Sequence, residues 1–559
     1  MSQFSDDTIC AISTPRGVGG IAVVRVSGPD AIKIADSVWG GKRLGEVKTH
    51  TAHFGDIIDS DGSKLDEAVA TVFRAPRSFT GEDTVELSVH GSVWVQRRLV
   101  MLLVERGARV AEAGEFTRRA FASGRLDLAQ AEAVADVIAA SSRSAHRVAM
   151  SQMRGDFSGR LASLREQLLE LSSLLELELD FSEEDVEFAS RTRLLDIVTA
   201  IQRETTRLAD SFSAGRAIKE GIPVAIVGAT NAGKSTLLNR LLGEERAIVS
   251  DIHGTTRDVI EDTIDIDGTL FRFIDTAGLR DTSDSIETMG IERTIAKLSQ
   301  ASIVIWVVDG TASHDDCRRA WQRIRPHLLP AQRLIPLINK ADIAPDSDAI
   351  ARTVATIIAD EFPSSYYDET NFKADAMPHT TASSAVDAVD DSGALSIPDV
   401  TTADIAIPSA EISSAADIAA DAGSISSSST PSSDIVADAD NTSATPHTEA
   451  DITPDSSGII RISARQGDIT TLHDAILKAS GIADISNEDI LVTNERHYQS
   501  LLRASQSITR AIDALHANLP GDLIAQDIRE TLHHLGEITG TITTHEILGT
   551  IFSRFCVGK

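Results

Sequence analysis

The sequence predicts a multidomain protein of mixed class: an α/β domain, then an all-α domain interrupted by a second, doubly wound α/β domain. The chain has 559 residues, and at roughly 150 residues per domain this length is enough for about three domains. Short apolar runs bounded by turns alternate along the chain with stretches of helical periodicity. Helical periodicity then returns after the second α/β region, so we interpret that region as an insertion into a discontinuous helical domain.

Residues 1–120 are predicted to form the first α/β domain. The runs GGIAVVRVSG, EAVATVFRA and DTVELSVHG are typical of strands, and the run from Ser92 to Glu105 has the periodicity of a helix. Residues 121–217 follow as the first part of the helical domain. Apolar residues there recur at steps of three and four and give one apolar face: Leu161, Leu164, Leu168, Leu171 and Leu175.

Residues 218–480 are predicted to form the inserted α/β domain. After Pro223 the periodicity changes, and apolar strand candidates appear that are mostly separated by helical patterns. This alternation is typical of a parallel, doubly wound sheet. Residues 481–559 are helical again and complete the all-α domain. The strand candidates are VAIVGA, FRFIDTAG, SIVIWVVDG, RLIPLINKAD and GIIRISAR.

Residues 364–457 differ in composition from the rest of the chain. They are dominated by Ala, Ser, Asp and Thr, and no aromatic residue follows Phe372 within them. Such a segment buries too little apolar surface to offset its ordering entropy, so we expect a disordered insertion. It is either a dispensable spacer or a tail that docks on a basic partner surface.

The net charge of the chain is −31, and residues 361–457 contribute −17 of it, with eighteen Asp/Glu and one Lys. Because the remainder is also acidic, any nucleic acid must bind a local patch or bind through a partner. The chain has no apolar stretch of 18 residues, and its start, MSQFSDDTICAIS, does not resemble a secretory signal. Cys10, Cys317 and Cys556 are too few and too scattered for a disulfide framework. We therefore expect a cytoplasmic protein with no membrane association.

A phosphate-binding loop lies between a predicted strand and a predicted helix. It runs from Gly228 to Ser235 with the sequence GATNAGKS. Its glycines let backbone N–H groups close around a β-phosphate, Lys234 reaches the β- and γ-phosphate oxygens, and the Ser235 hydroxyl binds Mg²⁺. This pattern predicts a nucleoside triphosphate site.

Further motifs, in the right order, identify the nucleotide as GTP. Asp275 of DTAG ends a strand, where a carboxylate can hold Mg²⁺ through water. Asp342 of NKAD can accept both guanine N–H donors, a pairing that adenine cannot offer. A threonine of GTTRD completes the Mg²⁺ shell, and the SAR sequence that begins at Ser463 backs the base. The predicted GTP-binding residues are Asn231, Ala232, Gly233, Lys234, Ser235, Thr236, Ser250, Asp251, Ile252, His253, Gly254, Thr255, Thr256, Asp275, Thr276, Ala277, Gly278, Asn339, Lys340, Ala341, Asp342, Ser463, Ala464 and Arg465, with Ser235 and Thr256 as the Mg²⁺ ligands.

One position departs from the usual GTPase pattern. Leu279 follows DTAG, where Ras-like enzymes carry the glutamine that orients the attacking water. A leucine cannot orient water, so another group must do so. The acidic stretch RDTSDSIETMG that follows supplies candidates.

With NAGKSTLLN, GTTRD, DTAGLR, NKAD and the terminal FCVGK, the chain resembles the MnmE (TrmE) tRNA-modification GTPases. SFTGEDTVE, GEFTRRAF with LDLAQAEA, and GEITG extend the resemblance over almost the whole chain except the acidic insertion. The chain departs from the family at Val557, where Ile is more common. The resemblance implies a folate-binding N-terminal domain, a discontinuous helical domain and an inserted Ras-like P-loop G domain.

The same resemblance implies partners and a reaction. Family members dimerise through the N-terminal domain and form a heterotetramer with the FAD-containing partner MnmG. Together they install aminomethyl or carboxymethylaminomethyl groups at C5 of the wobble uridine of certain tRNAs. A tetrahydrofolate derivative, 5,10-methylene or 5-formyl, is the expected folate ligand.

The resemblance also assigns roles to residues that the GTP motifs leave open. Asn231, Ser250, Ile252 and Thr255 would bind a K⁺ ion in the place of an arginine finger, with Ser250 standing where the family usually has Thr. Glu287 would orient the attacking water, so Glu287 and Lys234 are the expected catalytic residues. Arg25, Glu86, Arg125 and Lys559 match the folate site, with Arg125 standing where the family often has Lys.

Several interpretations stay open. Arg25 and Glu86 are either folate-binding residues or surface charges on strands, and Cys556 is either a redox or catalytic residue or a small buried hydrophobe. The basic run from Arg97 to Arg125 faces tRNA, a polyanionic folate tail or solvent. Two rival classes are a ribosome-assembly or RNA-binding GTPase and a signalling scaffold. The first should append a basic RNA-binding domain after the G domain, which the sequence does not show, and folate binding would separate the enzyme from both.

Overall fold

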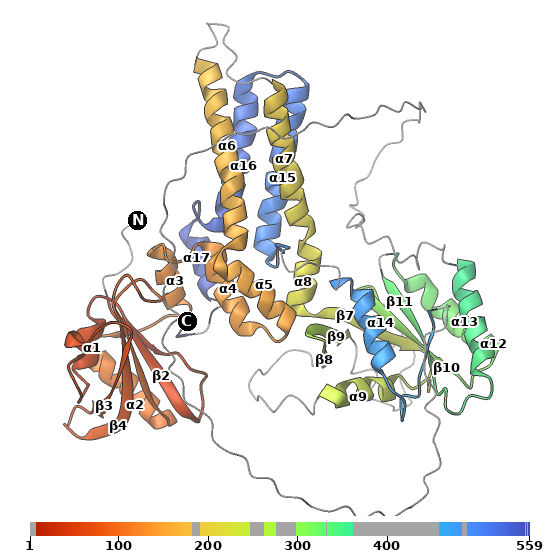
Figure 1. Cartoon of the computed structure of the whole chain (residues 1–559), viewed down its shortest axis with the longest axis horizontal. Helices are drawn as coiled ribbons and strands as arrows, with labels where there is room; N and C mark the ends of the chain where they lie inside the picture. Colours follow the sequence, from red (N-terminus) through yellow and green to blue (C-terminus); the bar gives the residue numbers. More distant parts are fainter. Residues whose placement is uncertain are drawn as a thin grey trace, which may run out of the picture. The chain divides into compact units, whose positions relative to one another are not determined.

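The computed structural model describes residues 7–180, 191–245, 262–274, 298–330, 332–361, 458–482, 489–553, 555 and 557–558. It contains an N-terminal α/β domain, a helical domain and a second α/β domain (Figure 1). This layout agrees with the predicted fold class. The acidic insertion lies outside the described residues. Within the described part of the chain, no helix has the length and apolar character needed to cross a membrane.

The N-terminal domain is built on a sheet with the strand order β3-β4-β5-β2-β1-β6. Its strand pairs are antiparallel except for β1 and β6, which are parallel. The predicted strands are confirmed as β2, β4 and β5, and the predicted helix as α2. The elements are β1 (Ile9–Ile12), β2 (Gly19–Ser27), α1 (Ala31–Asp36), the 3-10 turn η1 (Leu44–Glu46), β3 (Thr51–Ile58), β4 (Lys64–Phe73), β5 (Thr84–Gly91), α2 (Val93–Glu105) and β6 (Arg109–Val110).

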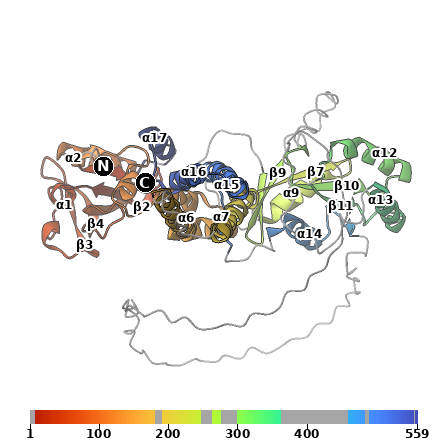
Figure 2. The ribbon, with the colours of Figure 1, turned by 90° about the horizontal axis from the view of Figure 1, so that it is seen from above.

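The helical domain combines segments from both sides of the inserted domain. Helices α6, α7, α15 and α16 pack side by side, and Figure 2 shows them end-on. The five leucines of the predicted apolar face are all buried in this core. The helices are α4 (Leu128–Ala139), α5 (Arg143–Arg154), α6 (Asp156–Asp180), α7 (Arg191–Asp210), α8 (Phe212–Glu220), α15 (Glu495–His516), α16 (Gly521–Thr539) and α17 (His545–Ser553), while α3 (Glu115–Ala122) belongs largely to the N-terminal domain and leads into this one.

A buried ionic cluster joins the two halves of the helical domain. Arg496 of α15 donates to Glu132 of α4 (2.9 Å) and to the backbone carbonyl of Glu537 on α16 (2.7 Å). His497 Nε2 lies 2.6 Å from a Glu132 carboxylate oxygen. Burial would raise the pKa of Glu132, but His497 and Arg496 outweigh it and hold that pKa at about 2. The carboxylate is therefore ionised and paired across the two halves.

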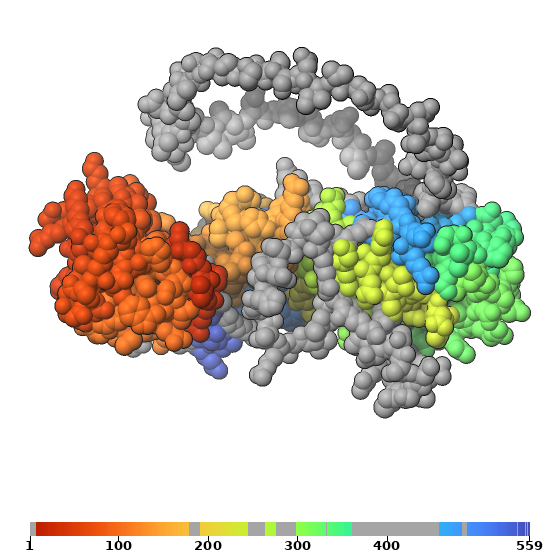
Figure 3. Space-filling view, turned by 90° about the horizontal axis from the view of Figure 1, so that it is seen from below, coloured from red at the N-terminus to blue at the C-terminus, as the bar shows by residue number. Residues whose placement is uncertain are grey.

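The second α/β domain contains a sheet with the strand order β12-β11-β10-β7-β9-β8. Its faces are covered by α9 and α14 on one side and by α12 and α13 on the other, which is the predicted doubly wound arrangement. Figure 3 shows α14, in light blue, beside the yellow-green α9. The elements are β7 (Ile222–Gly228), α9 (Lys234–Glu245), β8 (Asp262–Ile266), β9 (Thr269–Ile274), β10 (Ile303–Asp309), α12 (His314–Ile324), the 3-10 turn η3 (Arg325–His327), β11 (Arg333–Asn339), α13 (Ser347–Glu361), β12 (Ile460–Arg461) and α14 (Thr470–Ser480).

The prediction of a wholly parallel sheet is wrong at one edge. Strand β8 runs antiparallel to β9, whereas the other pairs are parallel. The two-residue turn between them has positive φ at Asp267 (51°) and Gly268 (80°). Positive φ at both positions matches the twist of a tight hairpin, and an Asp-Gly pair adopts it readily. The Asp-Gly pair in the sequence indicates this hairpin, but the alternation of strands and helices favoured a wholly parallel sheet.

The returning segment, in which the chain re-enters the helical domain after the inserted domain, passes close to α8. A Cβ atom built on Gly215 of α8 would lie 2.2 Å from the backbone oxygen of Val492. The Val492 N–H donates to the Ser211 hydroxyl (3.1 Å), and the Gln152 side chain donates to the Leu491 carbonyl (2.9 Å). Only glycine at position 215 permits this approach.

Gly215→Ala is expected to destabilise the protein by about 1–3 kcal/mol, because the added methyl group must push backbone away from backbone. Gly159→Ala is the matched control in α6, where an added Cβ meets nothing within 4 Å. It should stabilise by roughly 0.5–1 kcal/mol, since alanine is the better helix former. Chemical unfolding of both variants followed by circular dichroism measures the difference. Equal effects of the two substitutions would contradict the close approach.

Candidate functional site

Three loops predicted to bind nucleotide meet at the carboxyl edge of the second sheet. The register of the parallel strands aligns Gly228 with Val307 and Asp309 with Asn339. Strand β12, which leads to Ser463, pairs with β11 at the same edge. Ligands of open α/β sheets bind outside the carboxyl ends of the strands. The fold therefore brings these loops to the edge where a ligand is expected.

The phosphate-binding loop requires glycine at two positions. Gly228 has φ 152°, and a Cβ there would lie 2.2 Å from the Val307 backbone oxygen. Gly233 has φ 95°, and its Cβ would lie 2.1 Å from the side-chain nitrogen of Asn339. Asn231, at the exposed crest of the loop, also has a positive φ of 64°. The motif glycines thus allow the loop to close tightly against its neighbours.

Lys234 is positioned over this loop. Helix α9 begins at Lys234, so its first backbone N–H groups lie beside the loop, where an anion is favoured. The ammonium group donates to the carbonyls of Gly228 (3.0 Å) and Ala229 (2.8 Å). Burial lowers the pKa of Lys234. An anionic phosphate in the loop would stabilise the charged form that burial disfavours.

The side chain of Asn339 connects the phosphate-binding loop to the SAR loop. Its Nδ2 donates to the Ala232 carbonyl (2.8 Å), and its Oδ1 accepts from the Ala464 N–H (2.9 Å). Asn339 is only 2% exposed. Sequence reasoning placed Asn339 in the GTP site but did not anticipate this bridging role, which depends on two loops far apart in the chain.

The neighbouring Lys340 is held by a residue that sequence reasoning missed. Lys340 has φ 63°, and its Nζ lies 2.6 Å from Asp309 Oδ2. Burial raises the pKa of Asp309, but hydrogen bonds from Lys340 and Thr311 outweigh it and leave that pKa below its usual value. Asp309 ends the strand sequence WVVD at the same edge, which was the available signal. Asp342, which is predicted to bind the guanine base, follows this pair in the chain and is exposed to solvent.

The described part of the nucleotide site thus contains three of the predicted groups: residues 231–236, 339–342 and 463–465. The rest lies outside the described residues. This set comprises Ser250, Asp251, Ile252, His253, Gly254, Thr255, Thr256, Asp275, Thr276, Ala277, Gly278, Leu279 and Glu287, together with Cys556 and Lys559 of the C-terminal tail.

The N-terminal domain has a second candidate site around Arg25. Arg25 and Glu86 face each other across β2 and β5, with Nε 2.9 Å from Oε1. The Arg25 guanidinium carbon lies 5.5 Å from the ring centroids of Phe79 and Phe116. The two charged side chains are only 18% and 27% exposed. Both side chains are therefore partly buried, and sequence reasoning missed the aromatic rings around Arg25.

Arg125 lies close to this group. It lines a pocket that also contains Phe79, the ring beside Arg25. The pocket thus holds a cation and an aromatic surface together, and its Phe79 ring also lies beside Arg25. The other lining residues are His50, Phe73, Arg77 and Ser78.

Four arginines of the run from Arg97 to Arg125 are held in ion pairs within the domain. These four are therefore already neutralised, which argues against a continuous patch for a polyanion. The pairs are Arg98 with Asp59 and Glu105, Arg109 with Asp7 and Glu115, Arg118 with Glu112, and Arg119 with Glu82.

Comparison with known proteins decides the family. The family of the GTP-binding protein TrmE N-terminus matches residues 8–125, and that of the MnmE helical domain matches residues 128–556. A Parabacteroides distasonis protein is 42% identical over 557 residues, which are 99% of this chain and 100% of that protein. A Bacteroides thetaiotaomicron protein is 41% identical over 560 residues, the full length of both chains. Both relatives bear the name tRNA modification GTPase MnmE. The chain belongs to the MnmE family of tRNA modification GTPases.

This MnmE family member holds its C-terminal tail against the N-terminal domain. Val557 forms a β-bridge with Ala113, and the Ser13 hydroxyl donates to the Gly558 carbonyl (3.2 Å). A Cβ on Gly558, which has φ 99°, would lie 2.1 Å from the Ile12 carbonyl oxygen. The glycine of FCVGK is therefore required for this contact.

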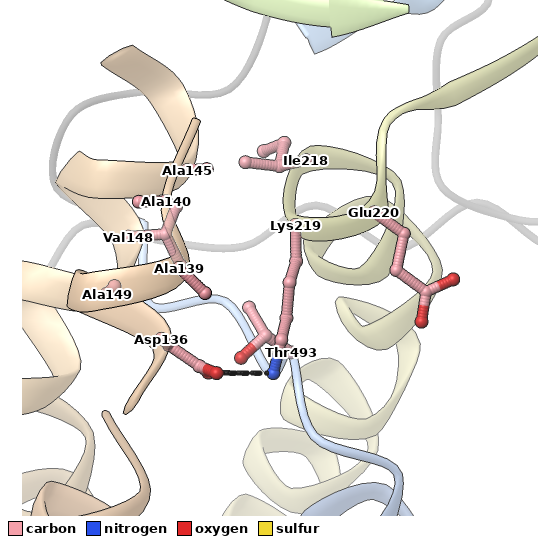
Figure 4. A pocket seen from close by; sticks show the side chains of 10 residues that line it. All are labelled: Asp136, Ala139, Ala140, Ala145, Val148, Ala149, Ile218, Lys219, Glu220 and Thr493. Atoms are coloured by element: carbon pink, nitrogen blue, oxygen red, sulfur yellow. Dashed lines mark hydrogen bonds and ion pairs between the residues drawn. The ribbon is translucent and has the colours of Figure 1, made fainter. Parts of the chain in front are cut away.

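A pocket lies between α4, α5 and α8 of the MnmE helical domain (Figure 4). Its wall is formed largely by alanines, with Val148 and Ile218. The charged groups at its side, Asp136 and Lys219, pair with each other at 2.7 Å. Glu220 and Thr493 also line the pocket, and they bond to Arg216 (3.0 Å) and to Gln152 (3.2 Å). Because these polar side chains have partners within the chain, the lining gives no indication of a ligand.

Asn339→Ala is expected to weaken GDP binding about 10-fold or more. The substitution leaves the Ala232 carbonyl and the Ala464 N–H without their partner, and an unmet buried group costs about 1–3 kcal/mol. A loss of 1.4 kcal/mol corresponds to roughly a tenfold change in affinity. Titration with a fluorescent GDP analogue measures it. Asn239→Ala, at an exposed position of α9, is the matched control and should bind normally. Normal GDP affinity in Asn339→Ala would show that the bridge is dispensable.

Proposed function

We propose that this MnmE family member hydrolyses GTP and, with an FAD-containing partner, modifies C5 of the wobble uridine of certain tRNAs. The product carries an aminomethyl or carboxymethylaminomethyl group. The observation that carries the GTPase part is the Asn339 bridge between the phosphate-binding loop and the SAR loop. This bridge connects the two loops at one edge of the sheet, which supports a single site for the phosphates and the base. We place the reaction in the cytoplasm, with tRNA as the substrate.

The described residues suggest how GTP is held. Asp342 accepts the guanine N–H donors, and Ala464 and Arg465 lie behind the base. Lys234 and the first N–H groups of α9 neutralise the phosphates. Ser235, at the start of α9, supplies a hydroxyl oxygen of the kind that Mg²⁺ prefers, with Thr256 as the second proposed ligand. Bound Mg²⁺ would offset charge on the phosphate oxygens.

Because Leu279 cannot orient water, we assign that role to Glu287. We further propose that Asn231, Ser250, Ile252 and Thr255 hold K⁺. Asn231 is exposed at the crest of the phosphate-binding loop with its left-handed backbone, so its side-chain oxygen is available to a cation there. A cation at this point offsets the charge that an arginine finger offsets in other GTPases.

Replacing K⁺ by Na⁺ is expected to lower GTP turnover at least ~10-fold, because the smaller ion fits the oxygen set poorly and a charge stabiliser is lost.

Glu287→Ala should retain GTP binding but lose about 10²–10⁴-fold in turnover. Release of phosphate under single-turnover conditions measures both effects, and Asp281→Ala tests the alternative candidate in the same acidic stretch. Equal turnover in the two salts would exclude the potassium proposal.

We propose that Arg25, Glu86, Arg125 and Lys559 bind a 5-formyl- or 5,10-methylene-tetrahydrofolate. Glu86 offers a carboxylate to ring N–H donors, and Phe79 offers a flat apolar surface. Arg125, in the same pocket, offers a cation for a carboxylate tail. The tail contact at Gly558 brings the residue before Lys559 to the same domain.

We also propose a homodimer through the N-terminal domain and a heterotetramer with an MnmG-type partner. The domain exposes large apolar side chains, including Val18 (89%), Phe54 (71%), Ile21 (69%) and Trp94 (64%). These side chains are the residues that we propose for the dimer interface, because apolar surface is commonly buried where subunits associate. Sedimentation of the whole chain as a monomer at micromolar concentration would contradict the dimer.

Cells that lack this protein should lose C5-modified wobble uridine, and the wild-type gene should restore it. Arg25→Gln should fail to restore it while GTP turnover stays normal, because Arg25 lies in the other α/β domain. Mass spectrometry of tRNA nucleosides reads the modification, and fluorescence titration with 5-formyl-tetrahydrofolate reads folate binding. Arg43→Gln, whose side chain is 77% exposed, is the matched control. Full modification of tRNA with Arg25→Gln would contradict the folate assignment. Unchanged tRNA nucleosides in the deletion strain would contradict the proposed function itself.

A further inference from the structure

Helix α16 carries a cluster of side chains outside the sites described above. The ligand atoms of His533, His534 and Glu537 all lie within 4.8 Å of one another. His533 Nε2 is 3.5 Å from Glu537 Oε1, and His534 Nδ1 is 3.3 Å from Glu537 Oε2. In a tetrahedral zinc site with bonds of about 2.0–2.1 Å, neighbouring ligand atoms lie about 3.3 Å apart. The spacing therefore already approaches that of a metal site.

Helix geometry explains the cluster. Residues three and four positions apart share one helix face, so Glu537 lies beneath both histidines. His534 is only 13% exposed, and its other ring nitrogen, Nε2, lies 3.6 Å from a carboxylate oxygen of Glu530. A metal-binding histidine commonly directs its second nitrogen to a carboxylate, which fixes the ring orientation. Glu530 is placed to serve in this way.

Two cations of α15 compete for the same carboxylates. Arg503 Nη2 lies 3.4 Å from Glu537 Oε2, and Arg510 pairs with Glu530. The Ser500 hydroxyl also donates to Glu537 (3.4 Å). Arg503 is 51% exposed, so its long side chain can turn to solvent at little cost. The arrangement is thus either a surface ion-pair network or a site in which a metal ion replaces Arg503.

We propose that His533, His534 and Glu537 bind one divalent transition-metal ion of the zinc type. Two imidazoles and one carboxylate suit Zn²⁺, whereas Mg²⁺ and Ca²⁺ prefer oxygen ligands alone. Three protein ligands leave a fourth position to water or to a group from a partner. Each histidine lies near a different oxygen of the Glu537 carboxylate. In this arrangement one ion can contact all three side chains. The site is independent of the nucleotide and folate sites.

The test uses the full-length chain stripped of metal and kept in millimolar Mg²⁺, titrated with Zn²⁺ against a chromophoric chelator. We expect one equivalent of bound Zn²⁺. Its affinity should fall more than about 100-fold in His533→Gln and in His534→Gln, because loss of a direct metal ligand weakens binding more than loss of a hydrogen-bond partner of that ligand. Glu530→Gln should weaken binding roughly 10-fold by freeing the His534 ring.

His516→Gln on α15 is the matched control, because it removes an exposed histidine outside the cluster. It should bind Zn²⁺ as the wild type does. Circular dichroism confirms folding, and the half-exposed His533 makes its variant the safer of the two. Normal Zn²⁺ affinity in both cluster variants, or no tight Zn²⁺ equivalent in the wild type, would overturn the proposal and leave the ion-pair network as the explanation. GTP turnover should be unchanged throughout.

Discussion

The close approach of α8 to the returning segment is the constraint on which the rest of this structure depends. The helical domain is assembled from two stretches of chain separated by the whole nucleotide-binding domain. Gly215 lets the Val492 carbonyl reach the α8 backbone, and Ser211 and Gln152 bind the same segment. Because both connections to the inserted domain pass here, this contact helps to set how the two halves of the helical core meet. The buried Glu132–Arg496 pair then joins the two halves a second time.

The nucleotide-binding domain has an analogous internal constraint in Asn339. One buried amide group satisfies a carbonyl of the phosphate-binding loop and an N–H of the SAR loop. Displacing either loop would break a buried hydrogen bond, so the two loops are energetically coupled. Gly233 strengthens this coupling, because any larger residue there would displace the Asn339 side chain. The two loops that we propose for binding the phosphate and the base therefore hold each other in place.

The sequence predicted those features that depend on local pattern. The strands β2, β4 and β5, the leucine face of α6 and the nucleotide motifs follow from periodicity and spacing. The short strands β1 and β6 offer too few residues for a pattern, and β8 was hidden within an apparently parallel alternation. Asp309 and the rings of Phe79 and Phe116 escaped notice for a different reason. Each acquires its role from a residue that only the tertiary fold brings near, respectively Lys340 and Arg25.

The distribution of charge bears on how an acidic protein of this family meets tRNA. The chain carries −31 overall. In the N-terminal domain, each of three arginines pairs with at least two carboxylates, so their positive charges are neutralised within the domain. These are Arg98, Arg109 and Arg119. Arg25 is likewise paired with Glu86. Polyanion binding needs cations whose field reaches solvent. Arginines in such pairs supply little of that field, which argues against a tRNA contact surface built on these arginines. The same pairing orients the Arg25 guanidinium, which supports the role that we propose for Arg25 in binding a small planar ligand.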